Sequence, residues 1–248
     1  DTANADRTVR ASGRQLGIIN VATDEWQFLS AADLQLLSAI GAQVGIALER
    51  ARLYDLTMMQ RKRLERELRM AREVQESLLP DTLPHIPGFS LAADWRSAME
   101  MAGDFYDVFA LSDGRWGMLI ADVSDKGASA AMYMAMTRSL VRASAVLHTS
   151  PAATLKEVNH HLNIHVSSDM FVTMFYASLD PQTRILTYAN AGQNPPLLRH
   201  ETGEMEKLTR TGVSLGILDE PALSDVSLTL APGDTLVAYT DGLTDALN

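Results

Sequence analysis

The sequence contains no cysteine, which excludes disulfide bonds, cysteine-ligated metal sites and catalysis by a thiol. Basic residues are also scarce, because 21 Lys and Arg stand against 31 Asp and Glu, for a net charge of -10. Nucleic-acid binding needs clustered positive charge, so this balance disfavours nucleic acid as a partner. No run of about 18 apolar residues and no secretory signal are present, so we expect no membrane insertion and a cytoplasmic location.

Proline is absent before Pro80, and apolar residues recur at helical spacing through that part of the chain. The segment Ser30–Asp33 matches a helix-capping box. Steps of four and three, the repeat of a coiled coil, separate Leu64, Leu68, Ala71, Gln75 and Leu78. We predict a helical linker over 51–82. Its stripe packs either against a second copy of the chain or against its own domain, and the sequence leaves both open.

Three acidic motifs each end a run rich in strand formers: GDFYD over 103–107, ADVSDKG over 121–127 and YTDG over 239–242. Between the first two, residues 112–114 (Ser-Asp-Gly) predict a three-residue hairpin loop that pairs Leu111 with Arg115. In this register Asp104 lies opposite Asp122, on the same face, with Cβ atoms roughly 5 Å apart.

Two facing carboxylates repel each other unless a cation lies between them. Mg²⁺ and Mn²⁺ prefer oxygen ligands, so these cations suit the three motifs better than Zn²⁺ does. Apolar residues occupy both faces of the hairpin, which indicates strands that are central in their sheet. Asp-Gly is also the commonest hairpin signal, so any one motif alone is more often a simple turn.

The three motifs, in this order and spacing, resemble the bacterial branch of the metal-dependent protein phosphatases (the PPM type), and among them the RsbU and SpoIIE group. Further matching phrases are MFVTMFY over 170–176, YANAG over 188–192 and APGD over 231–234. The resemblance covers about 71–248. It implies an α+β fold over 83–248, in which two sheets form a layered β-sandwich flanked by helices.

The resemblance also implies hydrolysis of phosphoserine or phosphothreonine on a protein, by a water held between two Mn²⁺ or Mg²⁺ ions. Asp122 resembles the carboxylate that bridges both ions, and the main-chain carbonyl of Val123 resembles a ligand of the first. Asp241 would bind the second ion, and Asp104 would lie in or just outside the first coordination shell. Asp104, Asp122 and Asp241 are therefore the predicted catalytic residues.

Two nearby residues keep open interpretations. Asp107 either orients metal-bound waters or is a surface residue of the hairpin. Arg96 either holds the phosphate or is a surface arginine on a strand. No residue is assigned as the general acid.

The sequence departs from the pattern of the family at several positions. Ala102 and Asp125 replace glycines, and Gln193 stands where the family usually has a histidine, which removes one candidate proton donor. The family also has a further Asp pair beyond the YTDG strand, whereas the sequence given ends at Asn248. With only Asp122 and Asp241 left for it, the second ion is expected to bind weakly.

The segment 1–50 resembles the end of a GAF sensor domain, on the strand-like run 16–21 and the apolar run 42–48. The resemblances together imply a phosphatase regulated through an N-terminal sensor, a homodimer formed through the linker, and a phosphorylated anti-anti-sigma (STAS-type) protein as substrate. Two alternatives are a catalytically inactive phosphatase-fold module that binds its partner without hydrolysis, and a purely structural dimerisation protein. The second leaves the three Asp motifs unexplained.

Overall fold

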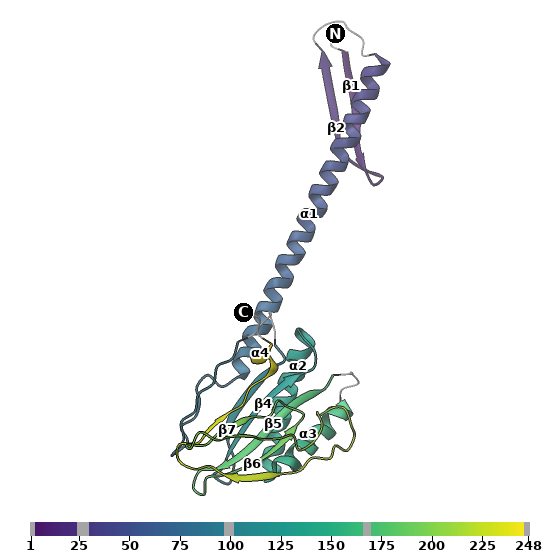
Figure 1. Cartoon of the computed structure of the whole chain (residues 1–248). Helices are drawn as coiled ribbons and strands as arrows, with labels where there is room; N and C mark the ends of the chain where they lie inside the picture. The colour runs from purple at the N-terminus through teal and green to yellow at the C-terminus, as the bar shows by residue number, and fades with distance from the viewer. Residues whose placement is uncertain (1–2, 24–29, 97–101, 166–169, 246–248) are drawn as a thin grey trace. The chain divides into compact units, whose positions relative to one another are not determined.

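The computed structural model describes residues 3–23, 30–96, 102–165 and 170–245 (Figure 1). The chain divides into two compact units, Asp1–Glu67 and Leu68–Asn248. Helix α1 (Ala31–Leu78) runs through the predicted boundary between residues 50 and 51. The predicted domain limits of 1–50, 51–82 and 83–248 therefore stay a prediction.

The first unit contains an antiparallel hairpin of β1 (Ala3–Ala11) and β2 (Arg14–Thr23), followed by the start of α1. The strand predicted over 16–21 lies within β2, whereas β1 was not predicted. The strand β1 crosses α1 at a point where the helix has no side chain, because a Cβ at Gly45 would overlap the carbonyl oxygen of Arg10. The sequence Thr-Asp-Glu over 23–25 predicts a polar turn, and these residues lie mostly outside the described part of the chain.

Helix α1 begins with the predicted capping box. The side chain of Asp33 accepts hydrogen bonds from the N–H and hydroxyl of Ser30 at 2.9 and 2.6 Å, and Ser30 Oγ accepts from the N–H of Asp33 at 3.2 Å. By length and composition alone, one 18-residue window of α1 is apolar enough to cross a membrane, and 11% of that window is buried within the structure. The expectation of no membrane insertion was based on the absence of an uninterrupted run of apolar residues. This window passes on its mean hydropathy although it contains polar residues.

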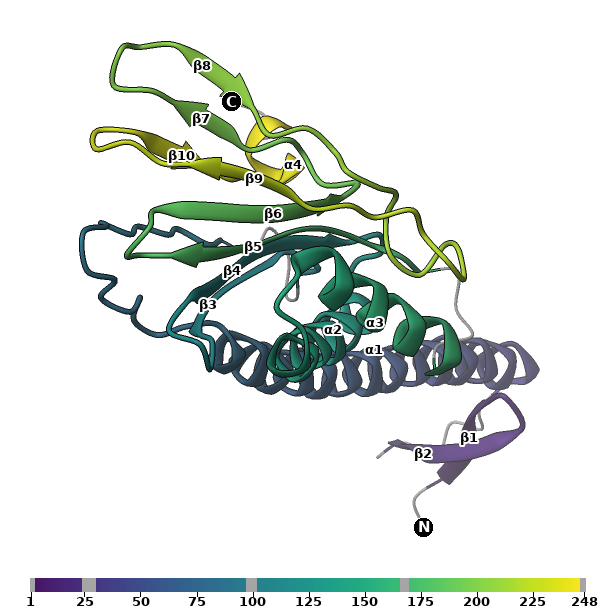
Figure 2. The same cartoon turned by 90° about the horizontal axis from the view of Figure 1, so that it is seen from below.

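The second unit is built on a five-stranded antiparallel sheet in the order β3-β4-β5-β6-β9. Its strands are β3 (Phe105–Ala110), β4 (Trp116–Val123), β5 (Val172–Asp180), β6 (Ile185–Ala191) and β9 (Val226–Thr229). Helices α2 (Ala128–Leu147) and α3 (Pro151–His165) cover one face of this sheet (Figure 2). The two strands of the predicted hairpin are β3 and β4.

The hairpin register is confirmed, since Phe105 pairs with Ala121 and Gly114 has a φ of 84°. The prediction that both hairpin strands are central is wrong for β3, which is an edge strand. Apolar residues on both faces of a strand show that both faces are covered. They do not show that both edges are paired.

A three-stranded sheet in the order β10-β7-β8 lies on the other side of the large sheet (Figure 2). Its strands are β7 (Leu197–Arg199), β8 (Met205–Lys207) and β10 (Thr235–Val237). The sequence did not predict β8 or the short helix α4 (Asp241–Thr244) that follows β10.

Two hydrophobic cores lie on opposite faces of the large sheet. Leu119 and Ala121 of β4 pack toward α2 and α3, whereas Met118 and Ile120 pack toward the small sheet, with Leu198 and Leu236. The predicted α+β layered β-sandwich is therefore confirmed. Because side chains alternate along a strand, Asp122 continues the face of Ile120 and lies on the side of the small sheet.

Candidate metal centre

Three predicted carboxylates meet at one end of the sandwich. Asp104 immediately precedes β3, Asp122 lies in β4, and Asp241 opens α4. One carboxylate oxygen from each lies within 4.8 Å of the others. Two of the three side chains come from the large sheet, and the third follows β10 of the small sheet. The acidic centre, as we call Asp104, Asp122 and Asp241, therefore joins the two sheets.

Local contacts hold Asp104 in place. The main-chain oxygen of Asp104 accepts a hydrogen bond from Trp95 Nε1, and its carboxylate accepts one from Thr240 Oγ1, both at 2.9 Å. Gly103 lets this segment approach β4, because a Cβ there would lie 2.9 Å from the carbonyl oxygen of Val123. A side chain at 103 would therefore press against the main chain of Val123, the residue after Asp122.

Negative charge from carboxylates outweighs positive charge at the acidic centre. Burial, the hydrogen bond with Asp104 and the charges of Asp104 and Asp241, in that order, together raise the pKa of Asp122 to about 8. The charge of Lys126 acts the other way, but less strongly. Without a cation, Asp122 therefore keeps its proton at neutral pH. A divalent cation would offset the repulsion that keeps the proton there.

Asp107 does not belong to this centre. Its side chain is completely buried and lies 2.6 Å from Arg142 Nε and 3.0 Å from Arg138 Nε. The interpretation of Asp107 as a surface residue is wrong, and its carboxylate is occupied by two arginines rather than facing metal-bound waters. Asp107 instead ties β3 to α2.

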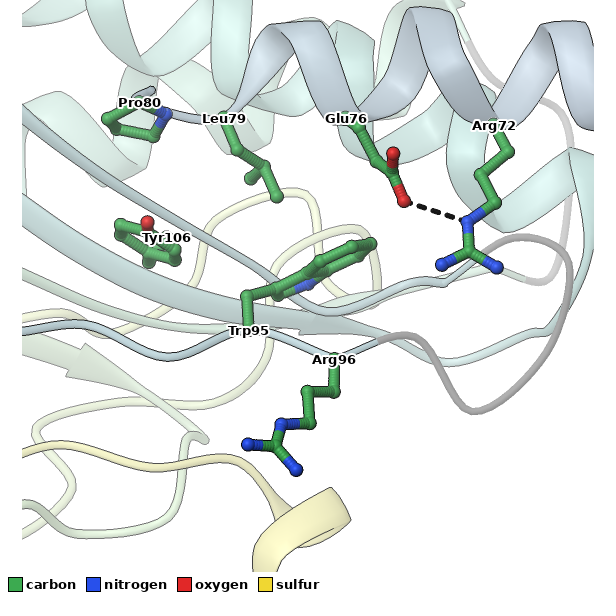
Figure 3. Close-up of a pocket in the computed structure, with 7 residues that line it drawn as sticks. All are labelled: Arg72, Glu76, Leu79, Pro80, Trp95, Arg96 and Tyr106. Atoms are coloured by element: carbon green, nitrogen blue, oxygen red, sulfur yellow. Dashed lines mark hydrogen bonds and ion pairs between the residues drawn. The ribbon is translucent and has the colours of Figure 1, made fainter. Parts of the chain in front are cut away.

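Arg96 is not on a strand. Its exposed guanidinium lies 3.2 Å from the carboxylate of Asp94. It lines a pocket of about 420 Å³ together with Trp95 and Tyr106, and its side chain points away from Leu79 (Figure 3). No contact places Arg96 at the acidic centre, so its proposed role with phosphate has no support here.

The structure shows what the C-terminal end of the predicted coiled-coil stripe packs against. Gln75 is buried, and its amide bonds to the main chain of Ala102 through Nε2 at 2.5 Å and Oε1 at 3.3 Å. Leu79 is also buried in the core of the second unit. This end of the stripe therefore packs against its own domain, whereas Leu64 is 56% exposed.

The positions that depart from the family pattern lie beside the acidic centre or near it. Asp125 accepts hydrogen bonds from the Lys126 N–H at 2.8 Å and Ser129 Oγ at 3.0 Å, which lower its pKa. Gln193 is buried and accepts a hydrogen bond from Thr173, the cross-strand partner of Asp122. The sequence analysis did not identify two threonines that make hydrogen bonds around the acidic centre. Thr173 donates to Gln193, and Thr240, which lies inside the YTDG motif, donates to Asp104.

Comparison with known proteins identifies relatives of the chain. Residues 112–248 match the family model described as Stage II sporulation protein E (SpoIIE). Protein IcfG of Synechocystis sp. is 32% identical over 73% of this chain and 33% of its own length. Phosphoserine phosphatase RsbU of Bacillus subtilis is 30% identical over 73% of this chain and 54% of its own length. The chain thus spans about a third to a half of the length of these relatives.

Among solved structures, the SiaA-PP2C domain of Pseudomonas aeruginosa matches with a TM-score of 0.63. The two chains are 23% identical, and the match covers 75% of each. At this identity the likeness concerns the fold alone. It agrees with the antiparallel sheets and flanking helices described above.

Proposed function

This chain is a member of the SpoIIE family, and on that premise we propose that it is a metal-dependent protein phosphatase, which hydrolyses phosphoserine or phosphothreonine on a regulatory protein. The observation that carries the proposal is the acidic centre. Three carboxylates from distant parts of the chain gather within 4.8 Å, although their charges repel one another. Such an arrangement costs stability unless a cation offsets it.

The residues present fit a hard divalent cation. Asp104, Asp122 and Asp241 offer carboxylate oxygens, and the Val123 carbonyl, which Gly103 approaches closely, would be a further oxygen ligand. Oxygen ligands of this kind suit Mn²⁺ or Mg²⁺, and we propose two such ions in the active protein. When bound, they would lower the pKa of a water and neutralise charge that grows on the phosphoryl oxygens.

The chain's own residues orient this site. Thr240 fixes one oxygen of Asp104, and Trp95 fixes the main chain of the same residue. Lys126 is exposed, and its positive charge acts on Asp122. A dianionic phosphate near the carboxylates would therefore meet one cationic side chain of the protein itself.

For the substrate, we propose phosphoserine on a phosphorylated anti-anti-sigma (STAS-type) protein in the cytoplasm. The support is the similarity to a phosphoserine phosphatase, RsbU of Bacillus subtilis, at 30% identity. The substrate is thus inferred from relatives, whereas the reaction is inferred from the acidic centre as well.

Release of phosphate from a phosphoserine anti-anti-sigma protein tests the proposal. We expect release that depends on Mn²⁺ and is lost in Asp122→Ala, because that change removes the carboxylate at the middle of the centre. A chain that binds Mn²⁺ and the phosphoprotein, yet releases no phosphate under any metal condition, would contradict it.

We also propose that an N-terminal GAF-type sensor regulates this site through α1. The support is the buried amide of Gln75, which bonds to Ala102, two residues before Asp104. In Gln75→Leu both hydrogen bonds are lost, and we expect altered phosphate release with the Mn²⁺ site intact. Equal rates in this variant and the wild type would argue against regulation by this route.

A homodimer through α1 is a further part of the proposal. Large apolar side chains that are at least 43% exposed lie along the helix at Leu36, Ile40, Leu53, Met59 and Leu64. A second copy of the chain would cover them. Light scattering should give the mass of a dimer, and Leu53→Glu with Leu64→Glu should give a monomer.

A second candidate function is an inactive phosphatase-fold module that binds its partner without hydrolysis. The observation that favours it is the small ligand set, since only three carboxylates gather among the described residues. Two ions would have to share Asp122. Partner binding that is independent of Mn²⁺, without phosphate release, would support this candidate.

A further inference from the structure

Gln193 follows β6, and its environment is unusual for a polar side chain. It is only 3% exposed, and its Oε1 accepts a hydrogen bond from Thr173 Oγ1. Its main-chain N–H donates to Asn190 Oδ1 at 2.9 Å. Its Nε2 is buried and has no hydrogen-bond partner among the residues that the structure describes.

Three neighbouring strands place Gln193 in a row with the acidic centre. Thr173 is the cross-strand partner of Asp122, so the two side chains share one face of the sheet. The register of β5 with β6 brings the start of the next loop, and with it Gln193, beside Thr173. Thr173 Oγ1 also lies 3.5 Å from the main-chain oxygen of Asp122. The row therefore runs from Asp122 through Thr173 to Gln193.

Packing alone does not account for a glutamine here. A buried amide nitrogen without an acceptor costs folding free energy, whereas an apolar side chain of similar shape would not. The polar contact that the Gln193 side chain does make is with Thr173. A threonine hydroxyl has a single proton, and giving it to Gln193 fixes the rotation of the hydroxyl.

We propose that Gln193 is a positioning residue for the acidic centre. By accepting the proton of Thr173, it fixes the Thr173 side chain against the main-chain oxygen of Asp122, and through that backbone it sets the position from which the Asp122 carboxylate binds a cation. The inference rests on the proposed function, because it takes Asp122 as a cation ligand. Partners that orient metal ligands typically change metal affinity by about 10–100-fold.

The test compares Gln193→Met, Thr173→Val and their double variant, with Thr173→Ser as the conservative change. Thr187→Val is a matched control. The hydroxyl of Thr187 hydrogen-bonds with Ser227 across the pair β6 and β9, and neither residue belongs to the row from Asp122 to Gln193. The Mn²⁺ dissociation constant is measured by calorimetric titration of the whole chain. The melting temperature is measured without metal.

We expect each single variant to weaken Mn²⁺ binding about tenfold. The double variant should be weakened by about the same factor, because the two residues act through one contact. Thr173→Ser and Thr187→Val should bind as the wild type does. The melting temperature without metal checks that each variant is folded, so that a loss of Mn²⁺ affinity reports on the site.

Two results would overturn the proposal: unchanged Mn²⁺ affinity in Gln193→Met, or effects of the two single variants that multiply in the double variant. The titration uses no substrate, so it is separate from the test of phosphatase activity. Wild type that binds Mn²⁺ without releasing phosphate would contradict the proposed function alone.

Discussion

Two carboxylates on neighbouring strands of the large sheet have opposite surroundings. Asp107 faces α2 and is surrounded by two arginines, Arg138 and Arg142. Asp122 faces the other way, and its nearest charged neighbours are the carboxylates of Asp104 and Asp241. A buried carboxylate with its own cations is part of the structure. Asp122, half-buried among other carboxylates, has no arginine partner of this kind among the described residues, and this distinguishes the candidate metal centre from a structural ion pair.

The largest effect should come from Asp122→Asn. Bound metal contributes several kcal/mol to phosphoryl transfer, so we expect phosphate release to fall about 10³-fold or more. The metal-free protein should not lose stability, because a neutral amide replaces a carboxyl group that resists ionisation. Phosphate release and thermal unfolding check this. If Asp122→Asn kept its activity but lost stability, Asp122 would have the structural role that is assigned here to Asp107.

Asp107→Asn should affect stability instead. It leaves the largely buried Arg138 without its partner, and breaking such a pair costs about 3 kcal/mol of unfolding free energy. Denaturant unfolding measures the loss, and Mn²⁺ affinity of the folded protein should stay close to that of the wild type. The matched control is Asp113→Asn, whose more exposed pair with Arg115 should contribute at most about 1 kcal/mol. Equal losses in the two variants would contradict the comparison.

Thr240→Val should have a smaller effect, confined to the metal. It removes the hydrogen bond that orients Asp104, so Mn²⁺ binding should weaken about tenfold. Thr240→Ser keeps the hydroxyl and should bind Mn²⁺ as the wild type does. If the serine variant is as weak as the valine variant, the methyl group rather than the hydrogen bond positions Asp104.

Metal binding should also depend on pH. The pKa of Asp122 is raised to about 8 from 3.8, so the folded protein binds this proton more tightly than the unfolded chain does. Stability without metal should therefore fall as pH rises between these values. Mn²⁺ competes with the same proton, so its apparent affinity should rise by up to about tenfold per pH unit until pH reaches about 8. Calorimetric titration at pH 6, 7 and 8 measures this slope, and Asp122→Asn should flatten it.

The sequence predicted local features well because local chemistry determines them. The loop at 112–114 sets the register that brings Asp104 opposite Asp122, and Ser30 marks the start of α1. The approach of Asp241 was not predictable from the residues themselves, because it depends on how two sheets pack. Resemblance to a family supplied that pairing.

The role of Asp107 could have been suspected from its partners. Arg138 and Arg142 are four residues apart, so they lie on one face of α2, and that face is otherwise largely apolar. Two arginines on the helix face that packs against a sheet favour a carboxylate on that sheet as their partner. Which carboxylate meets them depends on the packing of α2 on the sheet, so the sequence alone could not choose between Asp107 and its neighbours.

A crystal structure of the chain with Mn²⁺, phased on the anomalous signal of the metal, tests the central claim most directly. The account predicts an anomalous peak coordinated by Asp122 and Asp241, with Asp104 in contact and Asp107 still bound to its arginines. Full Mn²⁺ occupancy elsewhere, with no peak among these three carboxylates, would contradict it.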